Sequence, residues 1–274
     1  MGLSMARNIA TSGQLSAVWN RSRPPAIELE KAFGLEFCVD PAHLAEKCEA
    51  IFICVSADQD VLQVVERLLP GLQTGHVVVD LSTVSSETAR KSAALIERQG
   101  AAFLDSPVSG GVEGARNGTL AMMVGGDPDC LDRVMPVMES MGKRIVHMGP
   151  VGAGQATKAV NQIMAAGVNQ AVTEALAFGE RQGLPLDRLI DVIAGGAAGN
   201  WFLEHRGRSM TQSRFNPGFK IKLHHKDLLI CRNMARQMRF NSTIVDSTLD
   251  DYSKLMSEGF GEEDISALYR LKRS

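Results

Sequence analysis

The chain has 274 residues, 45% of them hydrophobic, and a formal net charge of −2. This length and composition allow a buried core in one large or two ordinary domains, and the balanced charge argues against a nucleic-acid-binding protein. The five cysteines form no Cys-x-x-Cys pair, and no apolar run has the length of a membrane span. We expect reduced thiols, no signal peptide and a cytoplasmic protein.

In the first 150 residues, short apolar runs alternate with amphipathic stretches. The runs have the length and β-branched content of strands in a parallel sheet that is covered on both faces. Predicted strands are residues 15–19, 50–55, 77–81, 101–104 and 120–124. Predicted helices are residues 26–33, 61–69, 86–99 and 130–141. This alternation predicts a doubly wound α/β domain, residues 1–150.

The pattern changes after Gly149-Pro150. Residues 154–182 predict one long helix that is apolar on most sides, which other helices or a second subunit should cover. Further helices are predicted at 186–193, 223–238 and 242–257, without any strand. Residues 151–274 should therefore form an all-helical domain.

The first eight residues have the pattern of a helix, and the next predicted strand follows at 15–19. A dinucleotide-binding fold has a strand and a Gly-x-Gly turn before this helix, and the sequence has neither. Either the protein begins with a helix, or its coding sequence starts about 10–20 residues upstream. In the second case the first strand is missing from this chain, and Gly2 is the last glycine of the fingerprint.

Two motifs carry candidate chemistry. In Ser109-Gly110-Gly111, bare backbone amides and a hydroxyl can hold a carboxylate, although a serine before two glycines can also be a simple turn. Lys158 precedes Asn161 and Gln162 by three and four residues, so the three share a helix face. A lysine there can exchange a proton with a substrate oxygen, and the alternative is an ordinary solvated lysine. Together the motifs predict an enzyme that acts on a small acid.

Asn20, Arg21 and Ser22 end the first predicted strand, where dinucleotide enzymes select their cofactor. An arginine can pair with the 2′-phosphate of NADP, so NADP is favoured over NAD. Alternatively, Arg21 stacks on the adenine and both cofactors work. We also expect contacts to the nicotinamide ribose from residues at or just after the ends of two later predicted strands. These residues are Val55, Ser56 and Thr83.

His224 and His225 lie beside Asp227, a composition that can suggest a metal site. Adjacent helical residues point about 100° apart, so two adjacent histidines rarely bind one ion. We expect no metal.

The chain resembles the β-hydroxyacid dehydrogenases, such as 3-hydroxyisobutyrate dehydrogenase, tartronate semialdehyde reductase and glyoxylate/succinic semialdehyde reductase. The resemblance covers nearly the whole chain. It depends on motifs at residues 1–8, 105–111, 118–126, 152–162 and 224–228, in this order and spacing. It implies a Rossmann NAD(P)-binding domain, a helical substrate and dimerisation domain, and a catalytic site between them.

The resemblance also assigns roles. Ser109, Gly110 and Gly111 match the substrate-carboxylate site, and Lys158 matches the general acid/base. Asn161 and Gln162 match the polar pair that orients the lysine and the substrate oxygen. Lys226 and Asp227 match a pair near the nicotinamide and substrate. The missing first strand and Gly-x-Gly turn depart from the family pattern.

We therefore expect an NAD(P)-dependent oxidoreductase, with NADP preferred, that interconverts a short β-hydroxy acid and its semialdehyde as a homodimer or homotetramer. Two alternatives remain open. Imine reductases are relatives that usually replace the catalytic lysine, and some relatives have become non-catalytic interaction modules.

Overall fold

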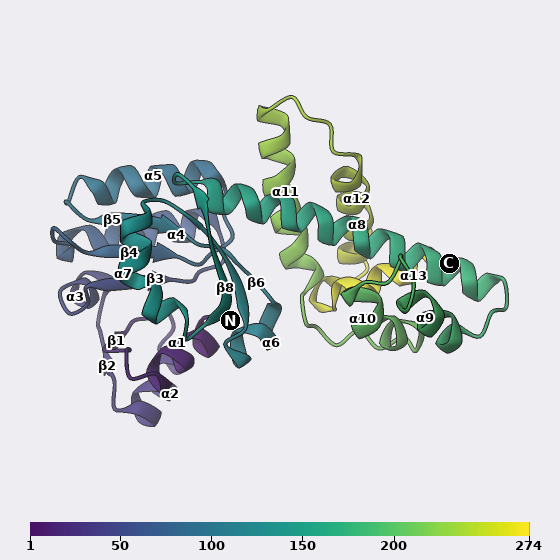
Figure 1. Ribbon diagram of the computed structural model, residues 1–274, viewed down its shortest axis with the longest axis horizontal. Coiled ribbons are helices and arrows are strands. Elements are labelled where there is room, and N and C mark those ends of the chain that lie inside the picture. The colour runs from purple at the N-terminus through teal and green to yellow at the C-terminus, as the bar shows by residue number, and fades with distance from the viewer. Residues whose placement is uncertain (274) are drawn as a thin grey trace. The chain divides into compact units, whose positions relative to one another are not determined.

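Figure 1 shows the computed structural model of the chain, which describes residues 1–273. The chain divides into two compact units, unit 1 (Met1–Lys158) and unit 2 (Ala159–Ser274). Unit 1 contains a mixed, mainly parallel sheet flanked by helices, and unit 2 is built from helices. The predicted fold class, an α/β Rossmann-type domain followed by an all-α domain, is confirmed.

Unit 1 alternates strands and helices along most of its length. In chain order its elements are α1 (Gly2–Thr11), β1 (Ala17–Val18), α2 (Pro24–Phe33), β2 (Glu36–Phe37), α3 (Pro41–Ala45), β3 (Ala50–Ile53), α4 (Asp58–Leu68), a 3-10 turn (Leu69–Gly71), β4 (Val77–Asp80), α5 (Ser86–Glu97), β5 (Ala102–Asp105), β6 (Val108–Ser109), α6 (Gly111–Asn117), β7 (Leu120–Gly125), α7 (Pro128–Met138) and β8 (Gly142–Gly149). All five predicted strands and four predicted helices are present. The prediction missed the short helices α3 and α6 and the strands β2 and β6, which have two residues each. It also missed β8, whose side chains are mostly exposed and show no buried run.

Strands β3, β4 and β5 run parallel, with Ala50 opposite Val77 and Val77 opposite Ala102. Strand β7 is antiparallel to β5 and β6 and parallel to β8. Val77 and Val79 belong to the core under α1 and α7, whereas Val78 belongs to the core under α4 and α5. Because both faces of the sheet are covered, these strands are continuous apolar runs.

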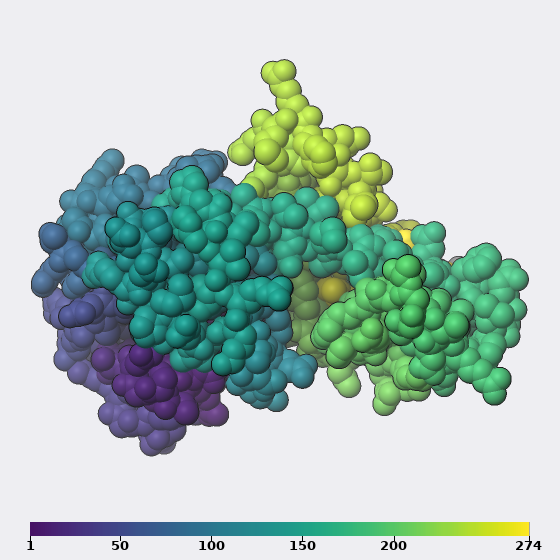
Figure 2. Space-filling view, viewed as in Figure 1, coloured from purple at the N-terminus to yellow at the C-terminus, as the bar shows by residue number. Residues whose placement is uncertain are grey.

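Strand β1 pairs only with β2, in a separate two-stranded parallel sheet among the described residues. A cavity of about 540 Å³ is lined by residues of α1, β1, α2 and β3. In a doubly wound sheet, the first strand of the fold occupies a central position, with later strands on both sides of it. The cavity therefore lies between β1 of the two-stranded sheet and β3, the edge strand of the larger sheet. The N-terminal segment, purple in Figure 2, forms part of the visible surface of unit 1.

Helix α8 (Ala153–Arg181) begins in unit 1 and continues into unit 2. The other elements of unit 2 are α9 (Leu186–Ala194), α10 (Trp201–Thr211), α11 (Ile221–Gln237), α12 (Thr243–Ser257), two 3-10 turns (Phe260–Glu262 and Ile265–Leu268) and α13 (Tyr269–Arg273). Their shared core includes Leu176, Leu228, Leu249, Tyr252 and Tyr269. The prediction missed α13, which has five residues, and α10, whose first and last turns are mixed in polarity. Along residues 1–273, no helix is both long and apolar enough to cross a membrane.

Candidate functional site

The Ser109-Gly110-Gly111 motif forms a tight turn between β6 and α6. Gly110 and Gly111 have φ values of +131° and +65°, which side-chain-bearing residues rarely adopt. A Cβ atom on Gly110 would also lie 3.2 Å from Leu120 Cδ2. The glycines are therefore required by the turn, in which Gly110 is exposed and Ser109 and Gly111 are half-buried.

Lys158 is buried, with only 7% of its surface exposed. Its Nζ atom donates a hydrogen bond of 2.9 Å to the carbonyl oxygen of Val108. Because Val108 directly precedes Ser109, the ammonium group lies beside the first residue of the glycine turn. The structure thus contradicts the alternative of a solvated surface lysine and brings the two predicted motifs together.

Gln155, in the first turn of α8, was not singled out by the sequence. Its side-chain Oε1 accepts from the backbone amide of Val84 at 3.1 Å, and its Nε2 donates to the carbonyl oxygen of Ser82 at 2.8 Å. Ser86 Oγ donates to the carbonyl oxygen of Gly152 at 2.9 Å. These bonds attach the start of α8 to the segment after β4, which contains the predicted cofactor residue Thr83. In the sequence, the one signal for a role of Gln155 is that it lies three residues before Lys158.

In unit 2, the structure joins the polar pair of α8 to the pair on α11. Asn161 Nδ2 donates to Gln162 Oε1 at 2.8 Å, and Gln162 Nε2 donates to Asp227 Oδ2 at 2.6 Å. Lys226 Nζ pairs with Asp227 Oδ1 at 2.9 Å. An ionised carboxylate only accepts hydrogen bonds, so Asp227 determines which end of the Gln162 amide faces it. Gln162 must then present its oxygen to Asn161.

His224 supports this group from within the unit 2 core, where it is fully buried. Its Nδ1 atom lies 3.0 Å from Tyr252 Oη, and its Nε2 atom lies 3.2 Å from the carbonyl oxygen of Gln162. Asn169 Nδ2 also donates to Tyr252 Oη at 2.9 Å. Both ring nitrogens of His224 are thus engaged by polar atoms of the protein, as expected for a structural histidine. His225 instead faces Ser253, and the absence of a metal stays a prediction.

Several of the predicted cofactor residues of unit 1 lie at the carboxyl ends of its parallel strands or at the start of α1. Gly2 begins α1, whose N-terminus has no side-chain cap, and a Cβ atom on Gly2 would lie 3.6 Å from Cys54, which directly follows β3. Val55 and Ser56 follow Cys54, and Thr83 follows β4. The carboxyl ends of parallel strands are where open α/β sheets bind ligands, with helix N-termini facing anionic groups.

Asn20, Arg21 and Ser22 form the loop after β1. Asn20 Nδ2 donates to the carbonyl oxygen of Ser22 at 2.6 Å and to its Oγ at 3.0 Å, which orders the loop. The Arg21 side chain is 77% exposed and pairs with Asp60 at 3.0 Å. An exposed ion pair contributes at most about 1 kcal/mol, so a phosphate could displace Asp60 from the guanidinium.

These groups fit a nicotinamide dinucleotide. An uncapped helix N-terminus suits a pyrophosphate, an accessible guanidinium suits a ribose phosphate, and the polar residues after β3 and β4 suit the nicotinamide ribose. Within residues 1–273, the glycine turn that precedes α1 in dinucleotide folds is not present. The fit is therefore better on the ribose side than at the pyrophosphate.

Comparisons with known proteins cover both units. The family model for the NAD binding domain of 6-phosphogluconate dehydrogenase matches residues 1–149. The model described as the NAD-binding of NADP-dependent 3-hydroxyisobutyrate dehydrogenase matches residues 152–272. The chain is 35% identical over 271 residues to 2-hydroxy-3-oxopropionate reductase of Escherichia coli, which covers 98% of this chain and 92% of that protein.

Two solved structures are similar over nearly the full length. One is 3-hydroxyisobutyrate dehydrogenase of Mycobacterium tuberculosis with L-serine, at a TM-score of 0.91 and 30% identity, covering 100% of this chain and 96% of that one. The other is Psf3 in complex with NADP+ and 2-OPP, at a TM-score of 0.88 and 25% identity, covering 99% and 96%.

Proposed function

Because the chain belongs to the β-hydroxyacid dehydrogenase family, a family of NAD(P)-dependent oxidoreductases, we propose that it interconverts a short β-hydroxy acid and its semialdehyde. The observation that carries this proposal is the buried Lys158, whose Nζ lies 2.9 Å from the carbonyl oxygen beside the Ser109-Gly110-Gly111 turn. This arrangement offers a proton donor next to an anion cradle. The relative that reduces 2-hydroxy-3-oxopropionate and the neighbour that holds L-serine both support a short-chain acid.

Each motif has one proposed role. The nicotinamide, when bound, supplies or accepts the hydride. The Ser109 hydroxyl and the amides of Gly110 and Gly111 hold the substrate carboxylate. In the reducing direction, the Lys158 ammonium gives a proton to the carbonyl oxygen as the hydride reaches its carbon, which forms the C–H and O–H bonds of the alcohol. In the oxidising direction, neutral Lys158 takes the hydroxyl proton. Such proton transfer contributes about 10²–10⁴-fold to the rate.

The remaining predicted residues have supporting roles in this proposal. Asn161 and Gln162 orient the lysine and the substrate oxygen, and the hydrogen bond from Gln162 to Asp227 keeps their amide groups in one orientation. We assign Lys226 a cofactor-binding role, and we propose that Arg21 selects NADP through the 2′-phosphate. The buried Lys158 weighs against the imine reductase alternative, and no observation favours a non-catalytic module.

The assay for this proposal is turnover of a panel of semialdehydes and hydroxy acids, each with NADPH and NADH. Lys158→Ala should lower kcat by at least about 10²-fold and leave cofactor affinity nearly unchanged. Lys91→Ala is the control, because Lys91 is an exposed lysine on α5 paired with Glu87, and it should retain full activity. Full activity of Lys158→Ala would remove this lysine from the mechanism, and no turnover of any substrate would favour the module.

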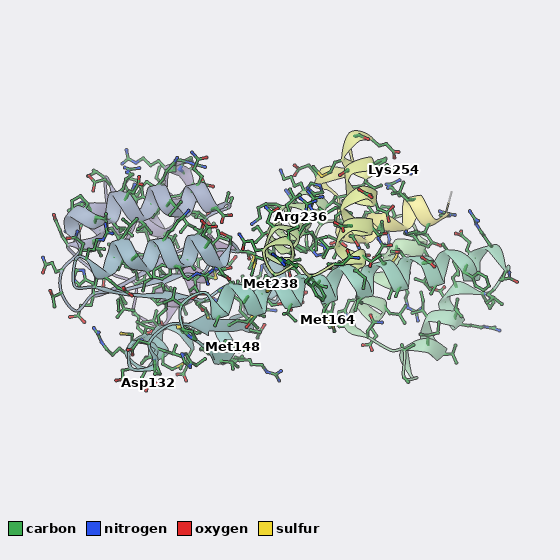
Figure 3. The ribbon with its side chains drawn as sticks, turned by 90° about the horizontal axis from the view of Figure 1, so that it is seen from above. Asp132, Met148, Met164, Arg236, Met238 and Lys254 are labelled. Carbon is green, nitrogen blue, oxygen red and sulfur yellow. The ribbon has the colours of Figure 1, made fainter. Side chains whose placement is uncertain are left out.

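We also propose that the protein is a homodimer or homotetramer built through unit 2. Apolar side chains of this unit are exposed in the single chain, including Met164 (66%) on α8 and Met238 (70%) after α11, both labelled in Figure 3. Val160, on α8 as well, is 62% exposed. Apolar groups of this size gathered on one unit are typical of an interface between copies. The cytoplasmic location stays a prediction.

A further inference from the structure

One short segment of unit 1 contacts α8 at two places. Asp105, the last residue of β5, accepts hydrogen bonds from the backbone amides of Gly152 at 2.7 Å and Gln155 at 2.8 Å, one to each carboxylate oxygen. Three residues later, the Val108 carbonyl oxygen accepts from Lys158 Nζ at 2.9 Å. Residues 105–108 therefore hold both the first turn of α8 and the ammonium group one turn further along.

The backbone of two glycines packs closely against Asp105. A Cβ atom on Gly154 would lie 2.5 Å from the Asp105 carbonyl oxygen and 2.8 Å from its Oδ2. A Cβ atom on Gly125 would lie 2.5 Å from Asp105 Oδ1. Because backbone encloses the carboxylate on both sides, α8 cannot slide along β5 without breaking these hydrogen bonds.

A buried aspartate is unusual and needs a compensating partner. Here the partner is the start of α8, whose first amides have no intrahelical acceptor and carry partial positive charge. Asp105 thus acts as a helix cap supplied from 47 residues earlier in the chain. Buried Asp80 lies opposite Asp105 in the sheet register and acts against this arrangement through its like charge.

We propose that Asp105 is a positioning residue, which fixes the first turn of α8 and thereby the place of Lys158 Nζ relative to the Ser109-Gly110-Gly111 turn. This inference depends on the proposed role of Lys158 as the proton donor. Asp105 itself need not contact the substrate.

The proposal has a pH-dependent consequence. Burial raises the pKa of Asp105 from 3.8 to about 7, helped by Asp80 and opposed by the two amide hydrogen bonds. The groups that face the carboxyl are Asp80 on β4 and the N-terminus of α8, with Lys158 one turn further along that helix. A protonated carboxyl carries a donor on one oxygen, so one of the two amide bonds is lost. Lys158 should therefore be held less firmly below about pH 7.

The decisive variant is Asp105→Asn, which keeps the size of the side chain but presents an NH2 group to one of the two amides. We expect kcat to fall about 10- to 100-fold, as small misplacements of catalytic groups do, with KM for the acid within about 3-fold. The ionisation near pH 7 in the wild-type profile should disappear. Asp127→Asn is the matched control, because Asp127 also accepts from two amides at a helix start, that of α7, and it should change neither kcat nor the pH profile.

Hydrogen exchange of the full chain, followed by mass spectrometry, tests the same idea without turnover. In the wild type, the amides of residues 152–158 should become better protected as the pH is raised through about 7. The exchange rates are first corrected for the intrinsic effect of pH. Protection of the first turn of α7 should not change. If no substrate turns over, the proposed function fails but this exchange result still decides the role of Asp105.

A wild-type kcat and pH profile in Asp105→Asn would overturn the proposal. If this variant does not fold, protection of residues 152–158 that is independent of pH in the wild type would overturn it as well.

Discussion

The close packing of α8 on the sheet makes a sharp prediction for Gly154→Ala. The added Cβ atom would lie 2.3 Å from the carbonyl oxygen of Met123 and 2.5 Å from that of Asp105. Ordinary contacts of a Cβ atom begin near 3.4 Å, so the helix must withdraw by about 1 Å (3.4 minus 2.3). Both carbonyl oxygens belong to the backbone of strands in the sheet. They cannot move away by a change of rotamer, as the end of a flexible side chain can.

Two effects of this variant can be estimated. Forcing a methyl group into a filled space costs typically about 1–3 kcal/mol of unfolding free energy. Alanine in place of glycine in a helix returns up to about 1 kcal/mol, so we expect a net loss of about 1–2 kcal/mol. A shift of about 1 Å at the start of α8 would also displace Lys158 from Val108, with a loss of kcat of about 10²-fold.

The matched control is Gly167→Ala, further along the same helix. Its Cβ atom would lie 3.5 Å from Ile244 Cδ1, an ordinary contact, so this variant should be as stable as the wild type or up to about 1 kcal/mol more stable. Urea unfolding followed by circular dichroism measures both stabilities, and steady-state kinetics measures kcat. If Gly154→Ala matched Gly167→Ala in stability and kept full kcat, the steric reasoning would be wrong.

Two further predictions concern the cofactor and the assembly. Arg21→Glu should lower kcat/KM with NADPH by at least about 10-fold while changing NADH little, since a phosphate contact is replaced by like charge; a wild-type preference for NADH would reject the role of Arg21. Light scattering should give a particle mass of two or four chains, and Met164→Glu should reduce it, because the charge would be buried at an apolar interface; a wild-type monomer at micromolar concentration would contradict the proposed interface.

Much of the fold could be predicted from the sequence because it depends on local periodicity. The apolar runs around β3, β4 and β5 and the long helical pattern of α8 each lie within one stretch of chain. The two glycines of the Ser109-Gly110-Gly111 turn are similar, since their positive φ values are a local backbone requirement. The spacing of Lys158, Asn161 and Gln162 also follows from one helix.

The tertiary structure alone shows which distant groups meet. Asp105 caps a helix 47 residues away, and Gln162 receives its orientation from Asp227 across 65 residues. Such hydrogen bonds depend on strand register and helix packing, which leave no periodic trace in either segment. Burial is decided in the same way, because the same lysine pattern at Lys158 fits an exposed helix and a buried one. The sequence thus determined the elements and the residue types of the candidate site, whereas packing over long distances decided which of those residues lie together and which are removed from water.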